Sequence, residues 1–260
     1  MFITGASGLL GRHLQRCKQA ESWDMIAPGS HSLDIRRRDS VLQMITEWKP
    51  AAVVHLAYRK DDRRTIVDGS RNVAEAAASV GARLVHVSTD VVFAGRAAPY
   101  TERDLPFAIT EYGRMKAAAE DAVATMAPRA AIMRTSLMYA TEFLAPLQLD
   151  VERALQGHTS STYFTDEYRC PAHAADIADA IATLASMPDV VGPLHVAGPE
   201  VLSRADLAHA VANWLGMNPN LVRTSTIAES GLDRPARIVL DCSLAQRLGI
   251  HVRPIGVALR

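Results

Sequence analysis

Two short stretches carry side chains that could pass a proton to a substrate oxygen. Tyr112 and Lys116 stand four residues apart in Y-G-R-M-K, at the start of a helix expected over 110–126, so both project from one helix face. A phenol has an ordinary pKa of about 10, and we expect the neighbouring ammonium to lower the pKa of Tyr112 toward working pH. Thr89, in V-S-T-D-V-V-F-A-G, ends an apolar run and is expected to hydrogen-bond the same oxygen. Alone, Tyr-x-x-x-Lys is more typical of an ordinary exposed helix pair, and its place after Ser88 and Thr89 in a chain with a glycine loop favours the chemical interpretation.

A glycine loop at the N-terminus is the second feature with a chemical use. Gly5, Gly8 and Gly11 follow an apolar strand expected over 1–4 and lead into a helix expected over 9–19. The first turn of such a helix has free backbone N–H groups at its positive end, where a pyrophosphate binds. Glycine allows the phosphates and the sheet to approach closely. A tight turn without a ligand is the alternative interpretation of the loop by itself.

The elements that must position these residues alternate between strands and helices. Continuous apolar runs predict strands over 24–27, 52–56, 84–88 and 130–133, and helical patterns predict helices over 41–48, 72–80 and 110–126. This alternation with short loops predicts an α/β fold, a doubly wound parallel sheet of Rossmann type. The glycine loop then lies at the first strand-to-helix turn, which favours dinucleotide binding.

The second half of the chain has a looser pattern. Helices are expected over 143–155, 174–185 and 203–215, with a strand over 194–196. We expect residues 1–140 to form the dinucleotide-binding domain, with 173–198 returning to it. A smaller substrate lobe would comprise 141–172 and 199–260, packed over the edge of the sheet where ligands of such folds bind.

Composition narrows the class of protein. The chain has 260 residues, 48% of them hydrophobic, and 28 basic side chains balance 28 acidic ones. A balanced charge argues against nucleic acid or an anionic membrane as a partner, and no apolar run is long enough to span a bilayer. The three cysteines, Cys17, Cys170 and Cys242, have no metal-ligand spacing. We therefore expect reduced thiols, no metal and, without a secretion signal, a cytoplasmic location.

The motifs together resemble a known enzyme family. T-G-A-S-G-L-L-G, S-T-D-V-V-F-A-G and Y-G-R-M-K are similar to those of extended short-chain dehydrogenase/reductases, and by motif to the dTDP-4-dehydrorhamnose reductase family. R-T-S-L-M-Y, G-P-L-H-V-A-G-P and D-R-P-A-R extend the resemblance over almost the whole chain. The resemblance implies that Thr89, Tyr112 and Lys116 are the catalytic residues. It also implies hydride delivery to the 4-keto carbon of a nucleotide-linked sugar, with Tyr112 as the proton donor.

The cofactor is expected to lie along the carboxyl ends of the strands. Ser30 and His31 follow the second expected strand, where enzymes that use NAD usually carry a carboxylate, so we expect NADP, with NAD as the alternative. With the residues that the resemblance implies, the expected cofactor-binding set is Gly5, Ser7, Gly8, Leu9, Leu10, Gly11, Ser30, His31, Asp34, Ile35, Leu56, Ala57, Tyr58, Ser88, Tyr112, Lys116, Thr135 and Ser136.

The substrate side of the site is expected to include Val91 and Arg234. Val91 follows S-T-D where dehydratases of this superfamily carry Glu, so a dehydratase is disfavoured. Arg234, in an Arg-Pro context, is the expected contact to the substrate diphosphate, ahead of Arg169 and Arg153. Two alternatives stay open: a nucleotide-sugar epimerase, and a cofactor-binding regulatory subunit resembling the methionine adenosyltransferase β-subunit. A homodimer is also left open.

Overall fold

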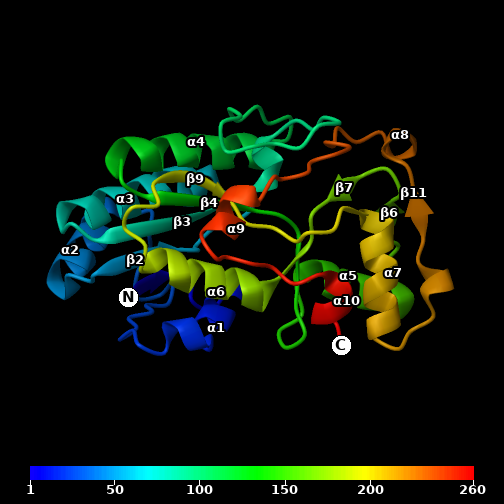
Figure 1. The fold of residues 1–260 in the computed structure, drawn as a ribbon, viewed down its shortest axis with the longest axis horizontal. Coiled ribbons are helices and arrows are strands. Elements are labelled where there is room, and N and C mark those ends of the chain that lie inside the picture. The colour runs from blue at the N-terminus through cyan, green and yellow to red at the C-terminus, as the bar shows by residue number, and fades with distance from the viewer.

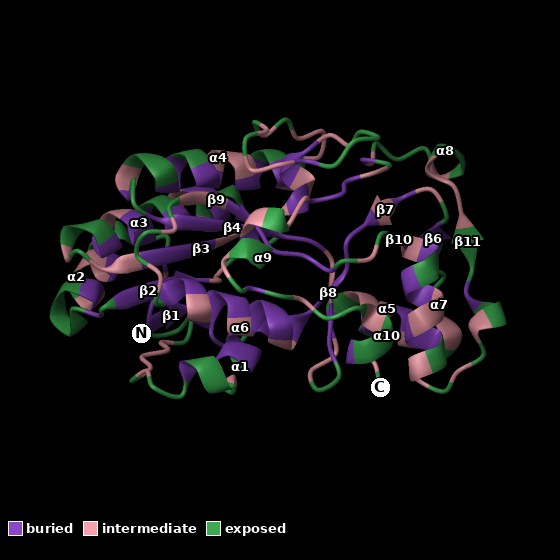
Figure 2. Cartoon of the chain, viewed as in Figure 1, coloured by how far each residue is buried: buried purple, intermediate pink, exposed green.

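Five apolar strands form a parallel sheet in the order β1-β2-β3-β4-β9 (Figure 1). The structure is a computed structural model that describes residues 1–260. The strands of this sheet are β1 (Phe2–Thr4), β2 (Ala52–His55), β3 (Arg83–Thr89), β4 (Ala131–Thr135) and β9 (Gly192–His195). Their side chains are mostly buried on both faces (Figure 2), which explains why their sequences are continuous apolar runs. The expected doubly wound fold is confirmed.

Helices cover both faces of this sheet. On one face lie α2 (Arg38–Trp48), α3 (Gly69–Ser79) and α4 (Glu111–Met126), and on the other lie α1 (Leu9–Leu14) and α6 (Ala174–Ala185) (Figure 1). Two separate hydrophobic clusters fill the spaces between the helices and the sheet, one containing Ile177 of α6 and the other containing Val73 of α3. Short helical turns complete this part of the chain: Lys18–Ala20, Arg64–Asp68 and Asp90–Val92.

A smaller lobe extends beyond the carboxyl ends of the strands. Its helices are α5 (Pro146–Leu155), α7 (Arg204–Trp214), α8 (Ile227–Ser230) and α10 (Ile255–Ala258), with a helical turn at Pro219–Leu221. Three two-stranded pairs accompany them: β5 (Met138–Tyr139) with β8 (Ala172–His173), β7 (Tyr168–Arg169) with β10 (Leu202–Ser203), and β6 (Tyr163–Phe164) with β11 (Thr224–Ser225). Ser203 begins α7 with a reciprocal cap, because its Oγ accepts from the Asp206 N–H at 2.9 Å. This lobe has a core of its own around Val151 and Leu207.

Three local features differ from the sequence-based expectations. The segment 24–27 makes only one β-bridge, Ile26 with Phe2, because the chain turns away at Pro28. The first helix ends at Leu14, and a separate helical turn follows. Part of the tail packs on the first domain and not on the lobe: α9 (Ser243–Arg247) contacts β9, and Ala245 belongs to the same cluster as Ile177. None of the helices combines the length and apolar character needed to cross a bilayer.

Candidate active site

The amino end of α4 presents Tyr112 and Lys116 to the carboxyl edge of the sheet. Thr110 begins this helix, and its Oγ1 accepts a hydrogen bond from the Gly113 N–H at 3.1 Å. Gly113 is required here because a Cβ would lie 2.1 Å from the Val91 carbonyl oxygen. The cap and this close approach fix the first turn of α4 against the loop that follows β3. Tyr112 and Lys116 therefore line the same cavity.

Lys116 is held by two acceptors on β3. Its side chain is buried, and its Nζ donates to the Val87 carbonyl oxygen at 2.8 Å and to His86 Nε2 at 3.4 Å. An ammonium has three donors, so one is left for a ligand in the cavity. Burial lowers the pKa of Lys116 to about 8, against the opposing effect of Glu120. Lys116 is thus a buried ammonium that titrates near working pH.

The pKa of Tyr112 differs from the sequence-based expectation. We expected Lys116 to lower its pKa, but burial raises that pKa well above 10, and Tyr58 and Asp90 add to the rise. The physical reason is that the Lys116 ammonium is bound to β3, so it does not offset the desolvation of the phenol. The Tyr58 ring lies 6.2 Å from the Tyr112 ring between centroids. Tyr112 is therefore a protonated phenol, the form that donates a proton in a reduction.

Thr89 is oriented by a buried carboxylate. Its hydroxyl donates a hydrogen bond to Asp90 Oδ1 at 3.3 Å and accepts one from the Val91 N–H at 3.4 Å. Asp90 Oδ2 accepts from Ser136 Oγ at 2.6 Å and lies 3.7 Å from Arg169 Nε. Burial raises the pKa of Asp90, while Arg169 and the two hydroxyls oppose that rise. Asp90 thus links the ends of β3 and β4 beneath the cavity.

The glycine loop has the shape that a pyrophosphate needs. A Cβ on Gly5 (φ +76°) would lie 2.6 Å from the Ala57 nitrogen, and one on Gly11 would lie 2.4 Å from Ala6 Cα. A Cβ on Gly8 would meet only the Gly5 oxygen, at 3.3 Å, so space remains in front of it. The first turn of α1 has no acidic side chain and no side-chain cap, so its N–H groups are free for an anion. These features fit a dinucleotide.

Two hollows adjoin at this loop and share part of their lining. One, of about 500 Å³, lies beside the loop at residues 28–36, and the other, of about 590 Å³, contains Thr89, Tyr112 and Lys116. Every residue expected to contact the cofactor lines one hollow or both, and the shared ones are Gly5, Gly8, Leu56, Ala57 and Tyr58. The structure thus brings the expected set together along one continuous cleft.

The adenosine end of this cleft is lined by polar and charged side chains. Ser30 and His31 line it as exposed residues, together with Arg36, which the sequence interpretation missed. Arg36 Nη2 donates to Asp34 Oδ2 at 2.8 Å, and this hydrogen bond lowers the pKa of Asp34. Arg36 Nη1 also lies 3.6 Å from Asp62 Oδ2, so its guanidinium lies between two carboxylates. The repeated arginines of D-I-R-R-R were a signal that could have found Arg36.

The two residues expected at the substrate do not line the cavity. Val91 packs against a hydrophobic cluster beside Phe93. Arg234 is engaged by Glu167, whose Oε1 accepts from Arg234 Nη2 at 2.9 Å. A different arginine, Arg204, lines the cavity from the start of α7. No local motif distinguishes Arg204 in the sequence, which explains why it was missed.

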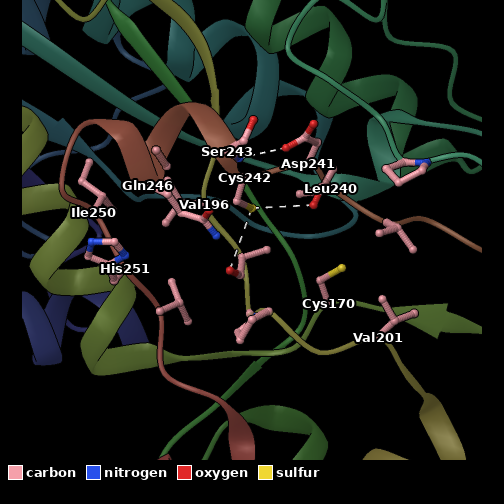
Figure 3. A pocket seen from close by; sticks show the side chains of 17 residues that line it. Cys170, Val196, Val201, Leu240, Asp241, Cys242, Ser243, Gln246, Ile250 and His251 are labelled. Carbon is pink, nitrogen blue, oxygen red and sulfur yellow. Dashed lines mark hydrogen bonds between the residues drawn. The ribbon is translucent and has the colours of Figure 1, made fainter.

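A separate hollow of about 310 Å³ lies between the end of β9 and α9 (Figure 3). Cys170 and Cys242 line it, and Cys242 Sγ donates to the Leu240 carbonyl oxygen at 3.7 Å and to that of Ala197 at 3.9 Å. Burial raises the pKa of Cys170 and raises that of Cys242 to about 12. Both are therefore protonated thiols. This hollow shares no lining residue with the cavity of Tyr112.

Comparison with known proteins agrees with this architecture. A family model described as the RmlD substrate binding domain matches residues 1–259. Methionine adenosyltransferase 2 subunit beta of Pongo abelii is 30% identical, covering 100% of this chain and 86% of that protein. A dTDP-4-dehydrorhamnose reductase of Mycobacterium tuberculosis is 33% identical, covering 91% of this chain and 81% of that protein.

A solved structure extends the likeness to three dimensions. The dTDP-4-dehydrorhamnose reductase of Bacillus anthracis, solved in complex with NADP, matches with a TM-score of 0.88 at 27% identity. The match covers 99% of this chain and 96% of that one. The resemblance inferred from the motifs is confirmed. The chain belongs to the RmlD substrate binding domain family, among the extended short-chain dehydrogenase/reductases.

Proposed function

We propose that this protein is an NADPH-dependent reductase of a nucleotide-linked 4-keto sugar, with Tyr112 as the proton donor. The observation that carries the proposal is that Thr89, Tyr112 and Lys116 line one cavity that continues into the hollow beside the glycine loop. The RmlD family match and the named reductases support an oxidoreductase that acts on sugar nucleotides. NADP bound to the Bacillus anthracis relative supports the choice of cofactor.

The roles of the three residues follow from their positions. Tyr112 holds its proton because burial raises its pKa, so it donates to the carbonyl oxygen as negative charge develops there. When the substrate binds, Thr89 turns its one hydroxyl proton from Asp90 to that oxygen, which gives the oxygen a second hydrogen bond and orients it. Lys116 uses its free N–H for the nicotinamide ribose and keeps a positive charge in the cavity that Tyr112 also lines. The dinucleotide, when bound, supplies the hydride.

The residues of the cleft fit a dinucleotide in two further ways. The free N–H groups of the first turn of α1 would hold the pyrophosphate, and Gly8 leaves room for it. Ser30 and His31 line the adenosine end of the hollow and would contact a phosphate on the adenosine ribose, while Arg36 pairs with Asp34 and Asp62 there. These contacts favour NADPH over NADH.

The test is NADPH consumption, followed at 340 nm, with 4-keto sugars linked to dTDP, UDP and GDP. We expect turnover with one of them, and we expect Tyr112→Phe to lower kcat by about 10²–10⁴-fold. Tyr139→Phe is the matched control. Tyr139 does not line the cavity, and its hydroxyl is buried and forms no hydrogen bond. Its kcat should match that of the wild type.

A regulatory subunit is the second candidate function, because methionine adenosyltransferase 2 subunit beta matches the whole chain. In that case NADPH binds tightly, no keto sugar is reduced, and the protein forms a stable complex with a catalytic partner. The same assay, combined with co-purification from the native host, separates the two functions.

A further inference from the structure

Arg204 is an unpaired guanidinium at the lobe end of the catalytic cavity. It is the first residue of α7, and its backbone N–H donates to the Glu167 carbonyl oxygen at 2.9 Å. Its side chain forms no salt bridge and donates no hydrogen bond within the protein, although it lines the cavity and is partly buried. Burial lowers the pKa of Arg204, and Arg234 and Arg169 lower it further, against Glu167. A cation in such a setting gains stability when an anion binds beside it.

The charged groups around Arg204 leave it without a counter-ion. Arg169 lies between two carboxylates, with its Nε 3.7 Å from Asp90 Oδ2 and its Nη2 3.1 Å from Glu167 Oε1. The other Glu167 oxygen is taken by Arg234. Three guanidiniums thus share at most two negative charges, and the excess positive charge belongs to Arg204.

Asp150, the carboxylate that lines the same cavity, does not supply the missing charge. Its Oδ1 accepts from Ser161 Oγ at 2.7 Å and its Oδ2 accepts from the Tyr163 hydroxyl at 2.9 Å. Those bonds hold Asp150 within the lobe, and it forms no ion pair with Arg204. The cavity therefore presents a free arginine fork at one end and the Tyr112 phenol at the other.

We propose that Arg204 binds the diphosphate of the substrate and so sets the preference for a nucleotide-linked sugar over a free one. This inference rests on the proposed function for the identity of the substrate. The guanidinium fork matches two phosphate oxygens, and the placement on α7 puts it across the cavity from α4. A sugar whose keto group meets Tyr112 and Thr89 then directs its phosphates toward the lobe. Arg234 and Arg169, our first candidates for this contact, are satisfied by carboxylates and support the walls of the site.

The experiment compares ligand binding to Arg204→Gln, Arg204→Lys and the wild type by calorimetry. The probes are dTDP, UDP, GDP, inorganic pyrophosphate, thymidine, glucuronate and NADPH. We expect Arg204→Gln to weaken binding of the preferred nucleoside diphosphate about 10–100-fold, and Arg204→Lys to retain part of the affinity. Binding of thymidine and NADPH should be unchanged. Arg153→Gln, an exposed arginine on α5, is the matched control and should bind every probe like the wild type.

The same variants separate this proposal from the proposed function. If keto sugars are turned over, Arg204→Gln should raise KM by the factor seen in binding and leave kcat within about threefold. If no keto sugar is turned over, the calorimetric binding of dTDP, UDP and GDP still tests the role of Arg204. Equal affinity of Arg204→Gln and wild type for nucleoside diphosphates overturns the inference. An effect on glucuronate without one on diphosphates also overturns it and assigns Arg204 to a sugar carboxylate.

Discussion

Lys116 Nζ and His86 Nε2 are joined by a 3.4 Å hydrogen bond inside the protein. Because an ammonium can only donate, His86 carries its proton on Nδ1, which has no partner. Burial, with Lys116 and then His55, keeps the His86 pKa well below 6.5. The His55 ring lies 5.3 Å away between centroids and is fixed by Thr4 and Ser70. His86 is thus a neutral acceptor that positions the Lys116 ammonium.

The first prediction concerns the pH dependence of turnover. Lys116 has a pKa of about 8, so activity that needs its ammonium should fall as pH rises through that value. His86→Leu removes a hydrogen-bond acceptor from the Lys116 ammonium, which lowers the pKa of Lys116 further. The alkaline limb of the kcat profile should therefore shift to lower pH by about one unit. His86→Gln keeps an acceptor and should restore the limb. An unchanged limb in His86→Leu would show that His86 does not act through Lys116.

The second prediction concerns the stability cost of burying Lys116. The fall of its pKa from 10.5 to about 8 corresponds to about 3 kcal/mol. Lys116→Met should therefore raise the free energy of unfolding by about 1–3 kcal/mol at pH 7. Between pH 8 and 10.5 the unfolded chain binds the proton that the folded chain has lost, so the wild type gains stability as pH rises. Urea unfolding at pH 7 and pH 10 should show the advantage of Lys116→Met shrinking, and a constant difference would contradict this.

The third prediction separates two glycines of the loop. Gly8→Ala should fold with a loss of about 1 kcal/mol or less, since its Cβ meets only one oxygen at 3.3 Å. That methyl group would fill the space in front of the helix, so we expect the Kd for NADPH to rise at least about tenfold. Gly11→Ala should instead unfold more easily, by about 2–3 kcal/mol, because its Cβ meets the Ala6 backbone at 2.4 Å. Fluorescence titration and thermal melts measure both, and tight NADPH binding by Gly8→Ala would show that the loop does not hold the pyrophosphate.

The fourth prediction concerns the thiols. Burial raises the pKa of Cys17 to about 11 and that of Cys242 to about 12, so neither is a thiolate at pH 8. Iodoacetamide at that pH should label the folded protein slowly and leave turnover intact. Mass spectrometry of the native and urea-unfolded protein measures the contrast. Rapid labelling of Cys242 in the native protein would place a reactive thiol in the hollow of Figure 3.

Local spacing was enough to predict one part of the site. Tyr112 and Lys116 are a turn apart on one helix, and the glycine loop follows directly from β1, so neighbours in sequence are neighbours in space. The other expected cofactor contacts follow strand ends, and parallel strands bring their carboxyl ends to one edge. For the same reason the order of strands and helices was sufficient to predict the fold.

Other parts of the site depend on pairings across long stretches of chain. Arg234 looked free in the sequence but is paired with Glu167, 67 residues away, whereas Arg204 is left unpaired. The pKa of Tyr112 depends on how deeply the phenol is buried and on which acceptors Lys116 meets on β3. The strand predicted over 24–27 is a further example. Its apolar residues favour a strand, but Ile26 alone forms a β-bridge with β1, and this depends on where the chain runs after it.

The central claim is hydride delivery to a sugar carbon with Tyr112 as the proton donor. Its most direct test is incubation of the enzyme with deuterated NADPH, labelled at the transferable position, and the preferred 4-keto sugar nucleotide. Mass spectrometry and NMR of the product should show one deuterium at C4 of the sugar with the wild type, and about 10²–10⁴-fold slower incorporation with Tyr112→Phe. A protein that binds NADPH tightly yet transfers no deuterium to any keto sugar would contradict the account.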